Sequence, residues 1–268
     1  MLLFNRCGME TAEVARRART ENFPIASLLF PRPLRPHLRA VYGFCRLVDI
    51  LGDESEGDRL ALLDECERQL DAPEWPVMVA LAPTRRQFSL PREPFERLIE
   101  ANRMDQRIAR YETWADVKHY CRHSADPVGR MVLGLLRLDG DDTLVAASDD
   151  VCTGLQLVNF FQDVPRDLAL GRVYLPQESL RRFGVERLGE PSAELRACLE
   201  YEGEHARRLL ESGRLFRERI PGRVGRAVWL FARGGLAALA ALERAGWDVY
   251  GGRPRPSRAR LALEALRT

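Results

Sequence analysis

Three oxygen-bearing side chains recur at every fourth position within LQLVNFFQDVPRDLALGRVYLP, residues 155–176 of this 268-residue chain. They are Asn159, Asp163 and Asp167, and a helix of about 3.6 residues per turn aligns them along one face. Carboxylates stacked in this way repel each other, and the repulsion costs more when they are withdrawn from water. We therefore expect a cation to lie between them.

The composition of the same segment argues against a plain solvated helix face. Mg²⁺ prefers hard oxygen ligands and is commonly held by one or two carboxylates together with substrate phosphates. The stripe therefore favours a magnesium site, the alternative being a polar face that binds no metal. The other sides of the helix are apolar, through Leu155, Leu157, Val158, Phe160 and Phe161.

A second acidic stripe lies about 110 residues earlier, in HLRAVYGFCRLVDILGDE, residues 37–54. Arg46, Asp49 and Asp53 occur at i, i+3 and i+7, which again is one helix face. The helix that carries them is apolar over most of its surface, as expected of a central helix. One pair of aspartates at this spacing gives weak support for a metal site, and two pairs on two apolar helices strengthen it.

The composition fits an ordinary globular protein, with 46% apolar and 30% charged residues. A net charge of +2 is too small to indicate binding of nucleic acid. The six cysteines form no CxxC pair, which favours reduced thiols in a cytoplasmic protein. The first ten residues lack the apolar core of a signal peptide. Arg233 interrupts the most apolar stretch, residues 227–245, so a membrane-spanning helix is not expected.

The sequence predicts helices throughout and no strand, because no period-two pattern with hairpin turns occurs. Thr113 is a suitable N-cap, and Pro127 and Gly129 predict a break in the helix that follows it. Pro165 should kink the helix of the Asn159 stripe. We expect one all-helical domain over residues 1–268, with helices at 11–19, 36–51, 56–70, 75–81, 94–108, 141–170, 192–220 and 224–245, a short helix ending near 183 and a final C-terminal helix.

Four motifs resemble the squalene/phytoene synthase family of head-to-head prenyl synthases, over almost the whole chain. They are AVYGFCRLVDILGDE, YETWADVKHYCRHSADPVG, NFFQDVPRDLALGRVYLPQE and GWDVYGGRPRPSR. The third is the most specific, because the acid spacing and the trailing GRVYLP agree together. Within the family, YCRHSADPVG and ENFPIASLLFPRPLRPHLRAVY resemble the hydroxysqualene synthase branch of bacterial hopanoid pathways. Asn22 and Pro24 stand where most relatives have a pair of serines.

The resemblance implies an isoprenoid-synthase helical bundle with a central cavity, in which two facing acid motifs hold Mg²⁺ ions and a diphosphate. The implied metal ligands are Asp49, Asp53, Asn159 and Asp163, with Asp167 a ligand or the partner of one. The implied catalytic set is Asp49, Asp53, Asp163, Asp167 and Tyr42. The implied substrate contacts are Asn22, Arg46, Arg122, Gln162, Arg166, Arg172 and Tyr174. Guanidinium groups suit phosphate through bidentate hydrogen bonding.

Two residues depart from the family pattern. Ile50 takes the place of the second of two adjacent aspartates, although Asp49 and Asp53, which share a face, are retained. Asp126 stands where the hydroxysqualene branch usually has asparagine. A buried carboxylate at this position would either acquire a raised pKa or disturb the pocket.

The function that the resemblance implies is Mg²⁺-dependent ionisation of presqualene diphosphate, followed by capture of the carbocation by water to give hydroxysqualene. One alternative is phytoene synthase or a reductive squalene synthase that uses a nicotinamide. Another is an inactive family member that acts as an assembly factor, although such a chain should have lost its acids. His119 and His123 have the i, i+4 spacing of metal ligands, and without a third ligand nearby a structural role is favoured.

The expected substrate, a long hydrocarbon with a charged head, must come from a bilayer. We therefore expect a cytoplasmic protein that contacts the inner face of a membrane transiently. The apolar helix at residues 224–245 is a candidate docking face, with Arg223, Arg226 and Arg233 around it. The alternative is that this helix belongs to the core of the bundle.

Overall fold

The computed structural model describes residues 30–257. Within them the chain is helical throughout, and extended backbone pairs only in an isolated bridge between Arg110 and Val173. The all-helical prediction is therefore confirmed for this part of the chain. The helices expected at residues 11–19 and after residue 257 lie outside the described residues, as do Asn22 and Pro24.

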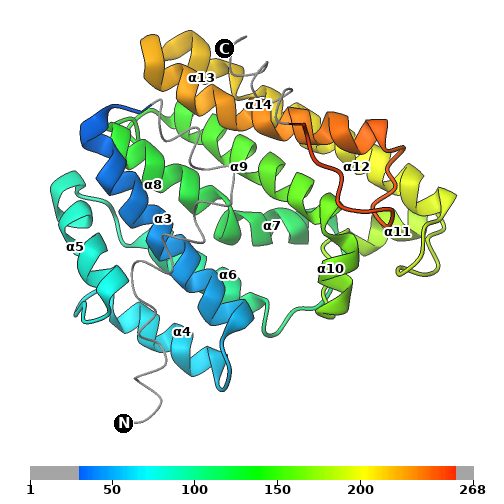
Figure 1. The fold of residues 1–268 in the computed structure, drawn as a ribbon, viewed down its shortest axis with the longest axis horizontal. Coiled ribbons are helices and arrows are strands. Elements are labelled where there is room, and N and C mark those ends of the chain that lie inside the picture. Colours follow the sequence, from blue (N-terminus) through cyan, green and yellow to red (C-terminus); the bar gives the residue numbers. More distant parts are fainter. Residues whose placement is uncertain (1–29, 258–268) are drawn as a thin grey trace.

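The helices follow one another through short connections (Figure 1). The first half of the described chain forms α3 (Arg35–Asp49), α4 (Arg59–Arg68), α5 (Pro76–Phe88), α6 (Glu93–Met104), α7 (Trp114–Ser124) and α8 (Asp126–Leu136). The second half forms α9 (Asp142–Gln162), α10 (Val164–Ala169), α11 (Gln177–Arg182), α12 (Ala193–Glu211), α13 (Arg214–Arg219) and α14 (Gly222–Arg244). A 3-10 turn (Arg32–Leu34) leads into α3, and a π-helical turn (Ile50–Glu54) follows it.

Helix α9 is the central element of the bundle (Figure 1). It packs against α8 and α12, and it also contacts α7, α13 and α14. Its N-terminal half belongs to an apolar core shared with α3, α5, α6 and α8. Its C-terminal half belongs to a second core shared with α7, α12 and α14. These neighbours explain why a helix that carries an acidic stripe is otherwise apolar.

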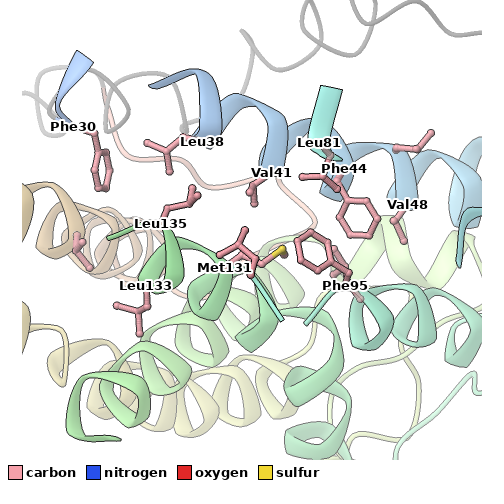
Figure 2. Packing of buried hydrophobic residues seen from close by; sticks show 14 of the residues in the cluster. Phe30, Leu38, Val41, Phe44, Val48, Leu81, Phe95, Met131, Leu133 and Leu135 are labelled. Carbon is pink, nitrogen blue, oxygen red and sulfur yellow. The ribbon is translucent and has the colours of Figure 1, made fainter. Parts of the chain in front are cut away.

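The first core fixes the helix that carries the earlier acidic stripe. Figure 2 shows the apolar face of α3 packed over α8 and α6. The rings of Phe44 and Phe95 meet edge to face, with their centroids 5.1 Å apart. Burial of each such side chain contributes about 1.5–3 kcal/mol, so α3 is held firmly through one face. The residues that meet there include Leu38, Val41, Phe44, Val48, Phe95, Met131, Leu133 and Leu135.

The signals that predicted the start and the break of the middle helix are confirmed. The peptide N–H of Asp116 donates to the Thr113 hydroxyl (3.2 Å), and the Asp116 carboxylate accepts from the Thr113 N–H (2.8 Å). The helix is interrupted at Ala125, and Pro127 lies in the first turn of α8. Pro127 is tolerated there because the first turn needs no N–H donor.

Helix α5 is longer than the sequence predicts, since it continues through Pro83 to Phe88. A proline inside a helix removes the hydrogen bond to the carbonyl four residues earlier. That carbonyl belongs to Val79, whose side chain is 50% exposed, and Pro83 is exposed as well. Both lie on the outer face of α5, where water can bond to the unpaired carbonyl.

The single helix expected at residues 192–220 is divided into α12 and α13 at Ser212 and Gly213. A Cβ added to Gly213 would lie 2.7 Å from the Cβ of Ala232 in α14. The close approach of α14 therefore requires glycine at this position. This is a tertiary constraint that local helix propensity does not reveal.

Among the described residues, α14 is long and apolar enough to cross a membrane by length and composition, and half of the relevant stretch is buried in the protein. The guanidinium of Arg233 lies over the ring of Trp229, 5.8 Å from its centroid. Arg223 and Arg226 at the N-terminal end are exposed. The burial is typical of a core helix and favours that interpretation for most of α14.

Candidate active site

The second acidic motif lies where α9 passes into α10. Asp163 is the residue between the two helices, because Pro165 cannot donate the next helical hydrogen bond. The peptide N–H of Asp163 still donates to the carbonyl of Asn159 (2.9 Å), and that of Asp167 to the carbonyl of Asp163 (2.8 Å). Despite the break, Asn159, Asp163 and Asp167 therefore still follow one another at intervals of one helical turn.

The first acidic motif ends α3 and enters the π-helical turn. Gly52 in this turn lies against α6, where a Cβ would come within 2.1 Å of the side-chain oxygen of Asn102. Asp49 and Asp53 are half-buried, whereas Ile50 is buried and 6% exposed. Ile50 therefore occupies an inward-facing position, and Asp49 and Asp53 are the more exposed residues of this motif.

Arg172 joins the two motifs. It follows α10, and its peptide N–H donates to the carbonyl of Asp167 (2.8 Å). Its Nη1 donates to Oδ1 of Asp53 at 2.7 Å and lies 4.0 Å from Oδ2 of Asp105. Burial alone would lower the pKa of Arg172, but Asp105 and Asp53 raise it above its usual value. The guanidinium is therefore a permanent positive charge between acids from different helices.

Asp105, just after α6, is the most deeply buried acid beside Arg172, with 7% of its side chain exposed. Its Oδ2 accepts a hydrogen bond from the hydroxyl of Tyr120 (2.6 Å), and its Oδ1 accepts one from Tyr174 (2.8 Å). Burial raises the pKa of Asp105 to about 6, against the opposing effects of Arg172 and the two tyrosines. Both carboxylate oxygens are therefore engaged by named donors.

Aromatic rings form a wall behind this network. The rings of Phe160 and Tyr174 stack with centroids 4.1 Å apart and planes 5° apart. Tyr111 stacks on Tyr174 at 5.9 Å, and Tyr120 lies 5.3 Å from Tyr174. A recess of about 10 Å³, roughly the volume that admits one water, is bordered by Phe160, Asp167, Arg172 and Tyr174. The wall fixes the tyrosine hydroxyls in place.

The C-terminal segment reaches back to the second motif. Arg253 Nη2 lies 2.9 Å from Oδ2 of Asp163, and Arg166 Nη1 lies 3.9 Å from the same oxygen. The side-chain amide of the buried Gln162 donates to the carbonyl of Pro254 at 2.5 Å. Figure 1 shows this segment, in red, turning back from the end of α14. It supplies one of the cations that neutralise Asp163.

Arg46 stands beside the first motif. Its Nη2 donates to Oε1 of Glu54 at 2.7 Å, and its Nη1 lies 3.9 Å from Oδ2 of Asp49. The guanidinium is about one-fifth exposed, whereas both acids are more than two-fifths exposed. Arg46 therefore presents positive charge at the more open side of the motif.

The oxygen donors present fit Mg²⁺. Burial raises the pKa of Asp167 to about 7, and the negative charge of Asp163 adds to the effect. A cation between these carboxylates would relieve their repulsion, and all donors are hard oxygens. No three acidic, histidine or cysteine side chains converge on a ready-made metal site within residues 30–257. Arginines neutralise Asp53 and Asp163 instead, so metal binding would take over that neutralisation.

The other predicted residues are distributed as follows. Tyr42 is half-buried on α3, one turn before Arg46. Asn159 is exposed at the end of α9. Arg122 is exposed on α7, and in the described chain no hydrogen bond or ion pair joins it to either acidic motif. Asn22 lies outside the described residues.

Sequence reasoning missed Asp105, Tyr120, Arg253 and Glu54. Asp105 belongs to no acidic repeat, and its two tyrosine donors come from other segments of the chain. Tyr120 and Arg253 lie inside motifs that carry the family resemblance, YETWADVKHYC and GWDVYGGRPRPSR. Membership of these motifs is the signal that could have identified Tyr120 and Arg253. Their distance in sequence from the acids follows no helical period and gives no such signal.

Asp126 lies at the start of α8, 4% exposed, and accepts a hydrogen bond from the hydroxyl of Thr153 in α9 (2.9 Å). Burial raises its pKa to about 7, and the charge of Asp149 adds to this, whereas Arg130 and Arg122 oppose it. Of the two outcomes that the sequence allowed, the burial of Asp126 therefore favours a raised pKa. The protonated acid is similar to an asparagine side chain in shape and in hydrogen-bonding capacity.

Asp126→Asn is expected to stabilise the protein at high pH. The folded pKa of about 7 exceeds the unfolded value of about 3.9, so the folded state holds a proton that the unfolded chain releases between these values. The carboxyl group therefore costs stability progressively from pH 4 to 7, and the cost is constant above pH 7. The variant should gain about 2–4 kcal/mol over the wild type at pH 8 and little at pH 4.5.

Urea unfolding of both proteins at the two pH values measures this difference. Asp64→Asn serves as the control, because Asp64 is 64% exposed in its pair with Arg103 and should show no such pH-dependent gain. An equal gain from Asp126→Asn at both pH values would contradict the raised pKa.

The chain is similar to known proteins over most of its length. The sequence model of the squalene/phytoene synthase family matches residues 16–263. A hydroxysqualene synthase of Rhodopseudomonas palustris is 38% identical over 207 residues, which cover 73% of this chain and 70% of that protein. A 15-cis-phytoene synthase of Synechococcus elongatus is 31% identical over 269 residues, which cover 92% and 86%.

A solved structure shares the arrangement of helices. The crystal structure of squalene synthase HpnC from Alicyclobacillus acidocaldarius superimposes with a TM-score of 0.81. It is 43% identical in sequence, and the match covers 90% of this chain and 95% of that one. The expected isoprenoid-synthase bundle is thereby confirmed.

Proposed function

The chain belongs to the squalene/phytoene synthase family, and from this premise we propose that it converts presqualene diphosphate and water into hydroxysqualene and diphosphate. The observation that carries the proposal is the bridge made by Arg172. This arginine follows the second acidic motif and ion-pairs with Asp53 of the first. Two acidic motifs and a buried cation thus meet at one place, which is the arrangement needed to bind a metal-complexed diphosphate.

The reaction begins with cleavage of the bond between carbon and the diphosphate oxygen, whose electron pair leaves with the diphosphate. Bound Mg²⁺ would neutralise the charge that develops on the leaving group. Asp49, Asp53, Asn159, Asp163 and Asp167 would hold the metal. Arg46 and Arg172 would bind and orient the diphosphate oxygens, since both guanidinium groups already lie among these acids.

The carbocation then rearranges beside an apolar surface. Phe160 and Tyr174 stack tightly next to Arg172 and limit the access of water from that side. One water adds to the cation through its oxygen and loses a proton, which gives the alcohol. Water is the expected terminating nucleophile because Asn22 and Pro24 replace the serine pair of most relatives and because the relatives named hydroxysqualene synthase are more identical to this chain than the phytoene synthases are.

Phytoene synthase is the second candidate. It is favoured by the greater share of this chain that a phytoene synthase matches, 92% against 73%. The two candidates differ in substrate, because a phytoene synthase condenses two geranylgeranyl diphosphates. They also differ in product, because phytoene contains no oxygen from water.

Product identification tests the proposal. Purified protein with Mg²⁺ is expected to convert presqualene diphosphate into hydroxysqualene without a nicotinamide, and ¹⁸O from labelled water should appear in the alcohol. Farnesyl diphosphate should be a poor substrate, since another enzyme must form the cyclopropyl intermediate. Squalene formation that strictly requires NADPH, or efficient condensation of geranylgeranyl diphosphate, would refute hydroxysqualene as the product.

We also propose transient contact with an anionic membrane through the N-terminal end of α14. Arg223 and Arg226 are exposed there, whereas half of the apolar stretch of the helix is buried in the protein. Each arginine near an anionic surface contributes about 1 kcal/mol of attraction. Sedimentation with phosphatidylglycerol vesicles should therefore be salt-sensitive and should weaken about tenfold or more in the Arg223→Glu, Arg226→Glu variant.

Arg187→Glu with Arg208→Glu, two exposed arginines outside α13 and α14, is the matched control for this membrane experiment. Binding that is unaffected by salt, or lowered equally by the control pair, would remove the assignment to α14.

A further inference from the structure

Asp105 differs from the other acids around the candidate site in its position and partners. It belongs to neither acidic motif, yet it lies near the same Arg172 nitrogen that bonds to Asp53. Its oxygens accept from Tyr120 and Tyr174, so its negative charge is held in one place by two hydrogen bonds. The nearest positive charge is Nη1 of Arg172, at 4.0 Å from Oδ2.

We propose that Asp105 is a positioning residue, which holds Arg172 in the orientation that meets Asp53 and the diphosphate. This inference rests on the proposed function. Arg172 contacts two acids through the same nitrogen, one at 2.7 Å and one at 4.0 Å, and is only 11% exposed. Without the charge of Asp105, the guanidinium would keep only the more exposed Asp53 and Asp167 as acidic neighbours, and it could turn away from Asp53 toward the solvent. With it, the charge is held between the π-helical turn after α3 and the segment after α6.

Fold stability alone is a weak reason for such an arrangement. Removing a carboxylate from water is expensive, and a buried ion pair is often no more stabilising than apolar residues of the same volume. The surroundings of Asp105 are otherwise aromatic, through Tyr111, Tyr120 and Tyr174. Burying the Asp105 carboxylate costs free energy that packing alone does not justify. Its orientation of Arg172 is the better explanation for its presence. Because the tyrosines fix both carboxylate oxygens, the orientation is set before any ligand arrives.

The binding of inorganic diphosphate in the presence of Mg²⁺ measures this effect without the chemical step. Asp105→Asn keeps the shape of the side chain and removes its charge, and it should weaken binding about tenfold to a hundredfold, the range typical of one charge-assisted hydrogen bond. Arg172→Gln should weaken binding at least as much. If Asp105 acts through Arg172, the double variant should bind no more weakly than Arg172→Gln alone.

The matched control is Asp64→Asn, which also removes an aspartate paired with an arginine, at 2.6 Å from Arg103, and should bind diphosphate as the wild type does. Thermal unfolding of each variant separates loss of stability from loss of binding. Unchanged affinity in Asp105→Asn would overturn the inference, as would effects of the two single variants that multiply in the double variant.

A crystal structure of Asp105→Asn without ligand tests the positioning itself. The inference predicts that Arg172 leaves Asp53 or adopts several orientations there. If Arg172 stays on Asp53, the inference fails whatever the protein binds. If the wild-type protein binds no diphosphate while Arg172 moves in the variant, the proposed function fails and the positioning role of Asp105 stands.

Discussion

Asp163→Ala is expected to lower the turnover of presqualene diphosphate by about a thousandfold or more. Removing a single group that stabilises transition-state charge commonly costs about a hundredfold to a thousandfold, and Asp163 serves in two ways. It would ligate Mg²⁺, and its Oδ2 also receives Arg253 and Arg166. Its loss would therefore leave two arginines without their acid and one metal position without a ligand. Single-turnover kinetics with saturating substrate measures the chemical step directly.

The stability of the Asp163→Ala protein must be checked in the same experiment. Asp163 lies at a helix junction rather than in a core, so the melting temperature should change by only a few degrees. Asp64→Ala, which removes an exposed aspartate from another arginine pair, should leave turnover unchanged. Normal turnover by Asp163→Ala would mean that the second stripe is no more than a polar helix face.

Removal of divalent metal is expected to abolish turnover, and added Mg²⁺ should restore it. The acids of both motifs are neutralised by arginines in the absence of a cation, so the protein should remain folded when a chelator is present. The chemical step should nevertheless stop, because arginines alone cannot supply the positive charge that bound Mg²⁺ would place beside the leaving diphosphate.

Circular dichroism and turnover, followed together during titration with EDTA, separate these two effects. The helical signal should stay constant while turnover falls to background, and stoichiometric excess of Mg²⁺ should recover it fully. Turnover that persists after exhaustive chelation would contradict the metal-dependent mechanism, even if every acid variant were inactive. Loss of helical signal on chelation would show instead that the metal has a structural role.

The sequence by itself determined the helical class and the two acidic stripes. Both follow from local rules, because a period of 3.6 residues places every fourth residue on one face, and prolines without an N–H end or bend helices. Pro127 and Pro165 interrupt the chain where the sequence predicts, and Thr113 caps α7. Asn159, Asp163 and Asp167 stay in succession because the helical hydrogen bonds continue across the break.

Local rules failed where a neighbouring element decided the outcome. Pro83 is tolerated within α5 because its side of the helix faces water, and the junction between α12 and α13 requires glycine at position 213 because α14 approaches so closely. Neither the exposure around Pro83 nor the approach of α14 to Gly213 can be deduced from the residues within one helical turn of that position. The sequence could indicate where helices occur and which of their faces are apolar, but it could not tell which face a neighbouring helix would cover.

Only the tertiary structure decided which charges neutralise the acids. Arg172 lies 119 residues from Asp53, and Arg253 lies 90 residues from Asp163, so no periodic pattern links either pair. Asp105 is invisible in sequence for the same reason, since its tyrosine partners are 15 and 69 residues away. Helical periodicity fixes relations within about two turns, whereas ion pairs depend on how complete helices pack. The sequence therefore predicts the type of site, whereas the packing of α6, α9 and α10 determined which charged side chains pair within it.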